Sequence, residues 1–196
     1  MKIKKNILLL FIITSCKAQI IPLYPLSNSY STSGAYYKDD QLDLNKFVGT
    51  WRFVSGSNSF TVVLQKKTHS FNASRNCYFD MIVGEYEYIN GTTTISTLSN
   101  IDNVNIGDFD HNIKNGYLLF EQRSTLDYQI IENIGVRVKF VNPLRPNFSA
   151  YMMITYHMDG NNNPFIKFRL TIPMQIIDGP DDFMINDDEY VMEKVN

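Results

Sequence analysis

The sequence predicts an all-β protein, an antiparallel meander of about eight to ten strands that closes into a barrel, with a β-sandwich as the alternative. Apolar and polar residues alternate along many short segments, and turns rich in Asn, Asp and Gly separate these segments. No long segment has helical periodicity. Neighbouring strands joined by short turns pair antiparallel, and such sheets close or split because open edges invite aggregation.

The first sixteen residues resemble a bacterial lipoprotein signal peptide. Three lysines lie within the first five positions, and an apolar run follows over residues 7–13. That run is far shorter than the roughly 20 residues that a membrane-spanning helix needs. Residues 13–16 resemble a lipobox, which would make Cys16 the new N-terminus and the site of acylation.

Two alternatives to lipidation remain open. Ordinary signal peptidase would cut after Ala18, because Cys16 and Ala18 are both small. In the second alternative, Cys16 is a residue with no role in processing or acylation. In the bacteria that carry such lipoproteins, acidic residues just after the cysteine often signal export to the cell surface. Residues 17–19 carry no acidic side chain. This favours a membrane-anchored lipoprotein of the cell envelope that faces the periplasm. Cleavage after Ala18 would instead give a soluble periplasmic or secreted protein.

Residues 17–44 are expected to form a flexible tether, and residues 45–196 the barrel domain. Pro22 and Pro25 interrupt regular structure, and residues 27–34 are mostly polar. Tyr30, Tyr36 and Tyr37 are the reason for caution, because aromatic side chains can pack back onto the domain.

The barrel strands follow from the period-two pattern. Asn90 and Gly91 give a strong hairpin signal, followed by a strand over 92–98. Residues 125–133 allow a helical turn or two. The other strands are expected at 47–54, 60–65, 77–84, 85–88, 117–123, 134–140, 149–157, 166–172 and 189–195.

Charge and cysteine content argue against a nonspecific nucleic-acid-binding protein and against a disulfide-stabilised fold. Without the three lysines of the signal, 15 basic residues remain against 20 acidic ones. This acidic balance argues against nonspecific nucleic-acid binding, which needs a basic surface. Cys77 is the only cysteine after Cys16, so no internal disulfide is expected. The fold must therefore depend on its hydrophobic core.

A Gly-x-Trp motif marks the entry to the first barrel strand. Gly49 and Trp51 at this place resemble the lipocalin and wider calycin barrels. The resemblance implies a glycine that permits a tight turn and a tryptophan that plugs one barrel end. In those barrels a cation stacks on the tryptophan, and Arg169 or Lys194 is the candidate here. The chain departs from lipocalins because no C-terminal helix is expected.

The longer stretch from Gly34 to Trp51 adds a second resemblance. Together with residues 76–78 and 84–86, it is similar to a family of small secreted or lipoprotein-like proteins from Bacteroidota. That family is functionally uncharacterised, so the resemblance implies a fold and no activity.

No catalytic residue, metal site or cofactor is predicted. His69, His111 and His157 lack metal-ligand spacing and are expected to be surface or strand-end residues. His111 lies beside two aspartates in a short cluster that is expected to be solvated. Cys77 is expected to be a small buried residue rather than a nucleophile paired with His69. The acidic segment 178–189 lacks the glycine of an EF-hand loop.

Three functions fit this pattern. The first is a membrane-anchored, noncatalytic envelope protein whose lipocalin-like barrel binds an apolar small molecule or a partner protein. The second is a structural or interaction module with a filled barrel and no small-molecule ligand. The third is an envelope hydrolase. The interior of the barrel distinguishes the first two, because eight strands can enclose either side chains or one small ligand.

Overall fold

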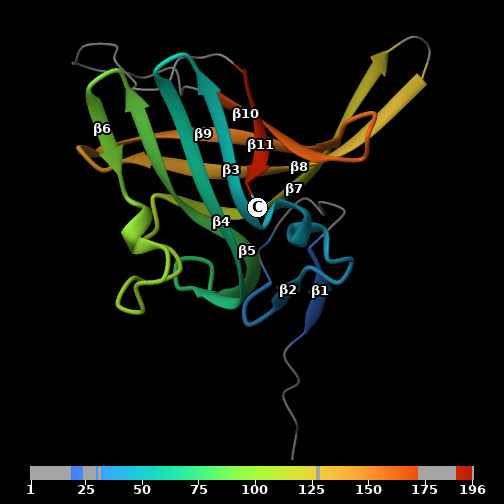
Figure 1. Ribbon diagram of the computed structural model, residues 1–196. Helices are drawn as coiled ribbons and strands as arrows, with labels where there is room; N and C mark the ends of the chain where they lie inside the picture. Colours follow the sequence, from blue (N-terminus) through green and yellow to red (C-terminus); the bar gives the residue numbers. More distant parts are fainter. Residues whose placement is uncertain (1–18, 24–29, 31, 127–128, 172–188, 196) are drawn as a thin grey trace, which may run out of the picture.

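The structure is a computed structural model that describes residues 19–23, 30, 32–126, 129–171 and 189–195. It is an all-β fold, as predicted, with two short 3₁₀ helices and no α-helix among these residues (Figure 1). The elements are β1 (Ile20–Pro22), β2 (Tyr36–Lys38), η1 (Asp43–Phe47), β3 (Gly49–Ser55), β4 (Asn58–Asn72), β5 (Cys77–Asn90), β6 (Thr93–Ser96), η2 (Leu98–Asn100), β7 (Ile113–Leu126), β8 (Gln129–Asn142), β9 (Arg145–Met158), β10 (Pro164–Thr171) and β11 (Glu189–Val195).

Eight of the strands form a closed antiparallel ring. The order around it is β5-β4-β3-β11-β10-β9-β8-β7, and β7 returns to β5. The closing pairs are Ile82 with Gly116 and Gly84 with Ile113. The structure therefore confirms the barrel and excludes the sandwich. Strands β1, β2 and β6 lie outside the ring and extend its sheet.

One edge of β5 pairs with β4, and the opposite edge pairs with three different strands. Its first residues pair with β2, its middle with β7 and its last with β6. The middle section needs glycines. A Cβ atom on Gly84 would lie 2.5 Å from the Val63 carbonyl oxygen, and one on Gly116 would lie 2.6 Å from the Ile82 carbonyl oxygen. These two glycines allow β7 and β4 to approach β5 from either side.

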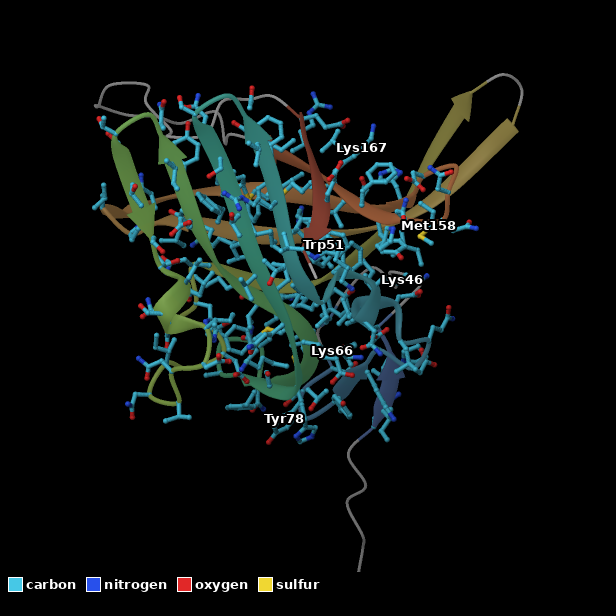
Figure 2. All side chains as sticks on the ribbon, in the orientation of Figure 1. Lys46, Trp51, Lys66, Tyr78, Met158 and Lys167 are labelled. Carbon is cyan, nitrogen blue, oxygen red and sulfur yellow. The ribbon has the colours of Figure 1, made fainter. Side chains whose placement is uncertain are left out.

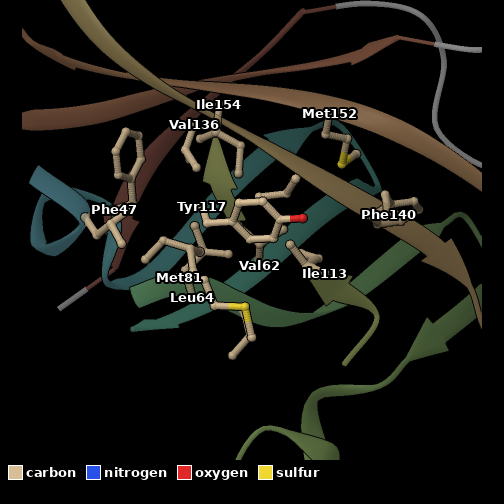
Figure 3. Packing of buried hydrophobic residues seen from close by; sticks show 14 of the residues in the cluster. Phe47, Val62, Leu64, Met81, Ile113, Tyr117, Val136, Phe140, Met152 and Ile154 are labelled. Atoms are coloured by element: carbon tan, nitrogen blue, oxygen red, sulfur yellow. The ribbon is translucent and has the colours of Figure 1, made fainter. Parts of the chain in front are cut away.

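Side chains fill the barrel interior. Alternation along β4 turns Phe60, Val62 and Leu64 inward, and all three are buried. Facing strands contribute Val138 and, as Figure 3 shows, Val136, Met152 and Ile154. Aromatic rings extend this packing along the barrel, in the pairs Phe60–Phe168, Phe60–Tyr86 and Tyr86–Phe140. The interior is thus a packed hydrophobic core.

The Gly-x-Trp motif lies at the closed end of the barrel. Trp51 is fully buried, and its indole Nε1 donates to the Phe47 carbonyl oxygen of η1 at 2.8 Å. Lys194 is the cation beside it, with Nζ 5.4 Å from the ring centroid, whereas Arg169 is exposed. Gly49 has φ +135°, and a Cβ there would lie 2.9 Å from the Lys194 side chain. The glycine therefore leaves room for the lysine.

Buried carboxylates fasten the segment before β3 to this end. Asp39 accepts from the backbone N–H groups of Asp43 and Leu44, at 2.9 and 3.1 Å. The same carboxylate pairs with Lys66 Nζ of β4 at 2.6 Å. Asp80 of β5 in turn accepts from the Asp39 backbone N–H at 3.1 Å. The chain leading into η1 is thereby bonded to two barrel strands.

The prediction of a flexible tether over 17–44 is wrong for the described residues of that segment. Strands β1 and β2 pair in parallel, and β2 joins β5. Tyr30 and Tyr37 are buried, and Tyr37 stacks on Phe79 at 5.1 Å between ring centroids. Tyr117 stacks on the same phenylalanine at 4.2 Å. The apolar side chains on either side of the polar run bury against the barrel, so the packed unit begins before residue 45.

Two local predictions change in detail. Residues 125–133 fall in the β7–β8 hairpin rather than in a helical turn, because β7 runs to Leu126 and β8 starts at Gln129. The predicted hairpin after β5 is present, with Asn90 paired to Thr93. Its central residues are therefore Gly91 and Thr92, and Gly91 takes the left-handed conformation at φ +58°. Cys16 lies outside the described residues.

The close packing of β4 against β5 predicts a difference between two glycine substitutions. We expect Gly84→Ala to lower the free energy of unfolding by about 1–3 kcal/mol, because the new methyl group would overlap the Val63 carbonyl. Gly160→Ala, in the β9–β10 turn, meets no atom within 4 Å and should change it little. Urea unfolding of both variants measures the difference. Equal midpoints would contradict the role given to Gly84.

Candidate functional site

A pocket opens at the barrel end opposite η1, between the β3–β4 hairpin and the start of β11. We call it the mouth pocket, and it has a volume of about 200 Å³. Four aromatic side chains and four polar ones line it: Phe53, Phe60, Tyr88 and Tyr190, and Ser55, Asn58, Ser59 and Glu189. It combines aromatic walls with a polar rim.

Edge-to-face contacts hold the aromatic walls. Tyr190 lies 5.0 Å from Phe53 and 5.6 Å from Phe60 between ring centroids, with interplanar angles of 85° and 68°. Tyr88 meets Phe60 at 6.2 Å and 76°. Such contacts restrict ring rotation, so the walls are organised before any ligand arrives. They form because the inward positions of β3, β4, β5 and β11 meet at this end.

The floor of the mouth pocket is Phe60. Beyond it, Phe168 and Tyr86 pack against the same ring at 5.2 and 6.0 Å. These side chains fill the barrel axis below the pocket. The mouth pocket is therefore shallow, and a ligand in it would remain at the rim.

The polar rim is partly fixed by its own bonds. Asn58 Oδ1 accepts from the Gly91 backbone N–H at 3.1 Å, which ties the β3–β4 hairpin to the β5–β6 turn. Glu189 pairs with Lys167 Nζ of β10 at 2.8 Å, and both side chains are partly exposed. The amide and the carboxylate thus stand at defined places on the rim.

A buried polar cluster lies on the outer face of β5, away from the mouth pocket. His111 Nδ1 is 2.9 Å from Glu85 Oε1, and Asn112 Nδ2 donates to Glu85 Oε2 at 2.8 Å. Both Glu85 and His111 are fully buried under the 97–112 segment. The prediction of a solvated His111 is therefore wrong. The cluster pins this segment to the barrel, and its burial keeps it from any substrate.

The other predicted residues lie elsewhere. His69 stacks on Tyr78 at the closed end, and His157 stacks on Phe165 on the outer face of β9 and β10. Cys77 begins β5 and is fully buried, as predicted, and burial raises the pKa of its thiol. No group of three or more His, Cys, Asp or Glu residues suited to a metal ion occurs among the described residues.

Comparison with known proteins gives a family. Residues 1–195 match the model of DUF6705, a family of unknown function. The chain belongs to DUF6705. Searches of curated proteins and of solved structures find no match. Family membership agrees with the resemblance to an uncharacterised family, and the structure adds an eight-stranded barrel to what is known of this DUF6705 member.

The sequence did not indicate either the mouth pocket or the Glu85 cluster. The aromatic residues of the pocket are inward positions next to turns, a pattern shared by every core residue of a barrel. Glu85 alternates with tyrosines along the strand, and this pattern predicts an outward, solvated side chain.

Within the described part of the chain, no helix is long and apolar enough to cross a bilayer.

The Glu85 cluster predicts a strong asymmetry between two neighbouring carboxylates. Glu85→Ala would leave His111 and Asn112 without their acceptor, and we expect a loss of about 1–3 kcal/mol in the free energy of unfolding. Glu87→Ala, two residues along the same face and partly exposed, is the matched control. Urea unfolding and limited proteolysis within 97–112 test this. Equal urea midpoints and equal rates of proteolysis within 97–112 in the two variants would refute the role of Glu85 in holding this segment to the barrel.

Proposed function

We propose that the protein is a noncatalytic, membrane-anchored protein of the cell envelope that binds a sugar ring in its mouth pocket. The observation that carries this proposal is an aromatic pocket with a polar rim above a filled barrel. The filled interior argues against a deeply bound apolar ligand, the usual use of a lipocalin-like barrel.

The size of the pocket favours a single ring. Ligand pockets for whole small molecules have volumes of roughly 300–1,000 Å³. The mouth pocket, at about 200 Å³, is smaller. An apolar cavity of about 150 Å³ already accepts benzene. One ring at the end of a larger molecule therefore fits, with the rest of that molecule outside the barrel.

The chemistry of the lining favours a sugar over a purely apolar ring. Phe53, Tyr88 and Tyr190 offer aromatic surface to the C–H faces of a sugar. Asn58 and Glu189 on the rim supply amide and carboxylate groups for its hydroxyls. A purely apolar ring would leave these polar groups without a ligand partner.

The lining supports binding rather than hydrolysis. Glycoside hydrolysis ordinarily uses two carboxylates that flank the scissile bond. Among the described lining residues of the mouth pocket, Glu189 is the single carboxylate, and it is paired with Lys167. This composition is the reason to place the envelope hydrolase behind a binding protein.

A second candidate function is an interaction module that uses its outer surface alone. The packed interior favours it, since a filled barrel needs no small-molecule ligand to be stable. The two functions differ in whether substitutions inside the mouth pocket affect recognition.

The mouth pocket is tested by a binding titration. We expect envelope-derived monosaccharides and short glycan fragments to bind, as measured by calorimetry or by NMR. Tyr88→Ala should weaken binding up to about tenfold, because an aromatic contact contributes about 0.5–1.5 kcal/mol and about 1.4 kcal/mol corresponds to a factor of ten in affinity. Tyr151→Ala is the control, since Tyr151 is an exposed tyrosine on the outer face of β9. Equal affinity in both variants, or no binding of any fragment, would sink the sugar site.

The anchor is tested separately in cells. We expect a fatty-acid analogue to label the wild-type protein and to leave Cys16→Ala unlabelled. Membrane fractionation of the same cells should move the variant out of the membrane pellet. Labelling that is unaffected by the substitution would refute acylation at Cys16.

A further inference from the structure

A row of apolar and aromatic side chains crosses four strands at the closed end of the barrel. The register aligns Ile20 of β1 with Tyr36 of β2, Tyr36 with Tyr78 of β5, and Tyr78 with Phe71 of β4. We call these four residues the outer row. The neighbouring positions Tyr37 and Phe79 face the opposite way, into the core.

The outer row is accessible to solvent. Ile20 is 64% exposed and Phe71 is 47% exposed, while Tyr36 and Tyr78 are half-buried. The rings are in contact: Phe71 lies 5.0 Å from Tyr78, and His69 stacks on Tyr78 at 4.2 Å. Exposed aromatic surface of this kind marks an interaction site more often than isolated apolar residues do.

The place of the row in the molecule indicates what it meets. Figure 1 shows β1 and β2 at one end of the barrel and the β3–β4 hairpin at the other. In Figure 2, Tyr78 lies at the lower end of the molecule and Lys167 near the upper end. The outer row and the mouth pocket therefore lie at opposite ends.

The chain length between Cys16 and β1 limits how far this end can be from a membrane. Ile20 follows Cys16 by four residues, which span at most about 14 Å when fully extended. An acylated Cys16 would thus hold the closed end within that distance of the bilayer. No part of the mouth end is constrained in this way.

The charges near the row suit an anionic surface. Lys38 of β2 and Arg75 of the β4–β5 turn are exposed basic residues, and Asp40 is the exposed carboxylate that follows β2. Asp80, the nearest acidic residue in β5, is buried and accepts a bond from the Tyr36 hydroxyl. Tyrosine rings with flanking cations are typical of membrane interfaces.

We infer that the closed end is a membrane-docking face, in which the outer row enters the headgroup region of an anionic bilayer and the mouth pocket points away from it. This inference rests on the anchoring in the proposed function. It adds an orientation, because one anchor alone would leave the barrel free to rotate about its attachment.

The test uses residues 17–196 without an acyl chain, a form that retains every described strand. We expect it to bind vesicles of phosphatidylethanolamine and phosphatidylglycerol more strongly than vesicles of phosphatidylcholine. The double variant Ile20→Ser with Phe71→Ser should reduce the partition coefficient about tenfold. The double variant Val54→Ser with Val191→Ser is the matched control, because these exposed valines lie on the outer face of β3 and β11. Equal partition of the two double variants would overturn the docking face.

A second measurement does not depend on loss of binding. Trp51 is fully buried, so an indole introduced by Phe71→Trp should report the lipid contact. Brominated lipids should quench that variant and leave the wild-type fluorescence nearly unchanged. Absence of added quenching would also overturn the inference.

The outcomes separate this inference from the anchor. If cells do not acylate Cys16 but residues 17–196 still bind vesicles through the outer row, the anchoring fails and the docking face stands. If Cys16 is acylated and residues 17–196 do not bind vesicles, the docking face fails and the anchoring stands.

Discussion

The edge of β5 is the constraint on which the rest of the structure depends. The backbone N–H and C=O groups along a strand edge need hydrogen-bond partners. On this edge of β5, three different strands supply them. The section paired with β7 closes the ring, and the flanking sections hold β2 and β6. Gly116 makes the approach of β7 to β5 possible, and Gly84 that of β4 on the other side. Because β2 is paired to the same edge, the N-terminal segment becomes part of the barrel.

Closure determines how the interior can be used. Large inward residues such as Phe60 and Phe168 meet across a narrow ring and leave the axis packed. Among the described residues, the mouth pocket is the space that lies above this packing, where β3, β4 and β11 end or begin. The proposed binding site is therefore at the rim of the barrel rather than in its interior.

The two ends of the barrel differ in construction. The closed end is covered by η1 and by the segment that carries Tyr30 and Tyr37, and buried carboxylates bond that cover to β4 and β5. At the opposite end the β3–β4 and β5–β6 turns are short, and no such cover occurs among the described residues. An anchor four residues before β1 would give these ends different surroundings, membrane on one side and solvent on the other. The proposed sugar site then faces the compartment in which its ligand would be found.

The sequence by itself determined the fold class, most strand positions, the Gly49–Trp51 motif and the burial of Cys77. These features follow from period-two alternation and from local residue chemistry, which neighbouring residues in the chain specify. Tertiary structure alone decided that Lys194 rather than Arg169 lies over Trp51, that His111 is buried against Glu85, and that the expected tether packs on the barrel. Each of these contacts joins residues far apart in the chain, and only ring closure brings them together. The same closure decided that the described inward side chains pack against one another, because their separation depends on all eight strands at once.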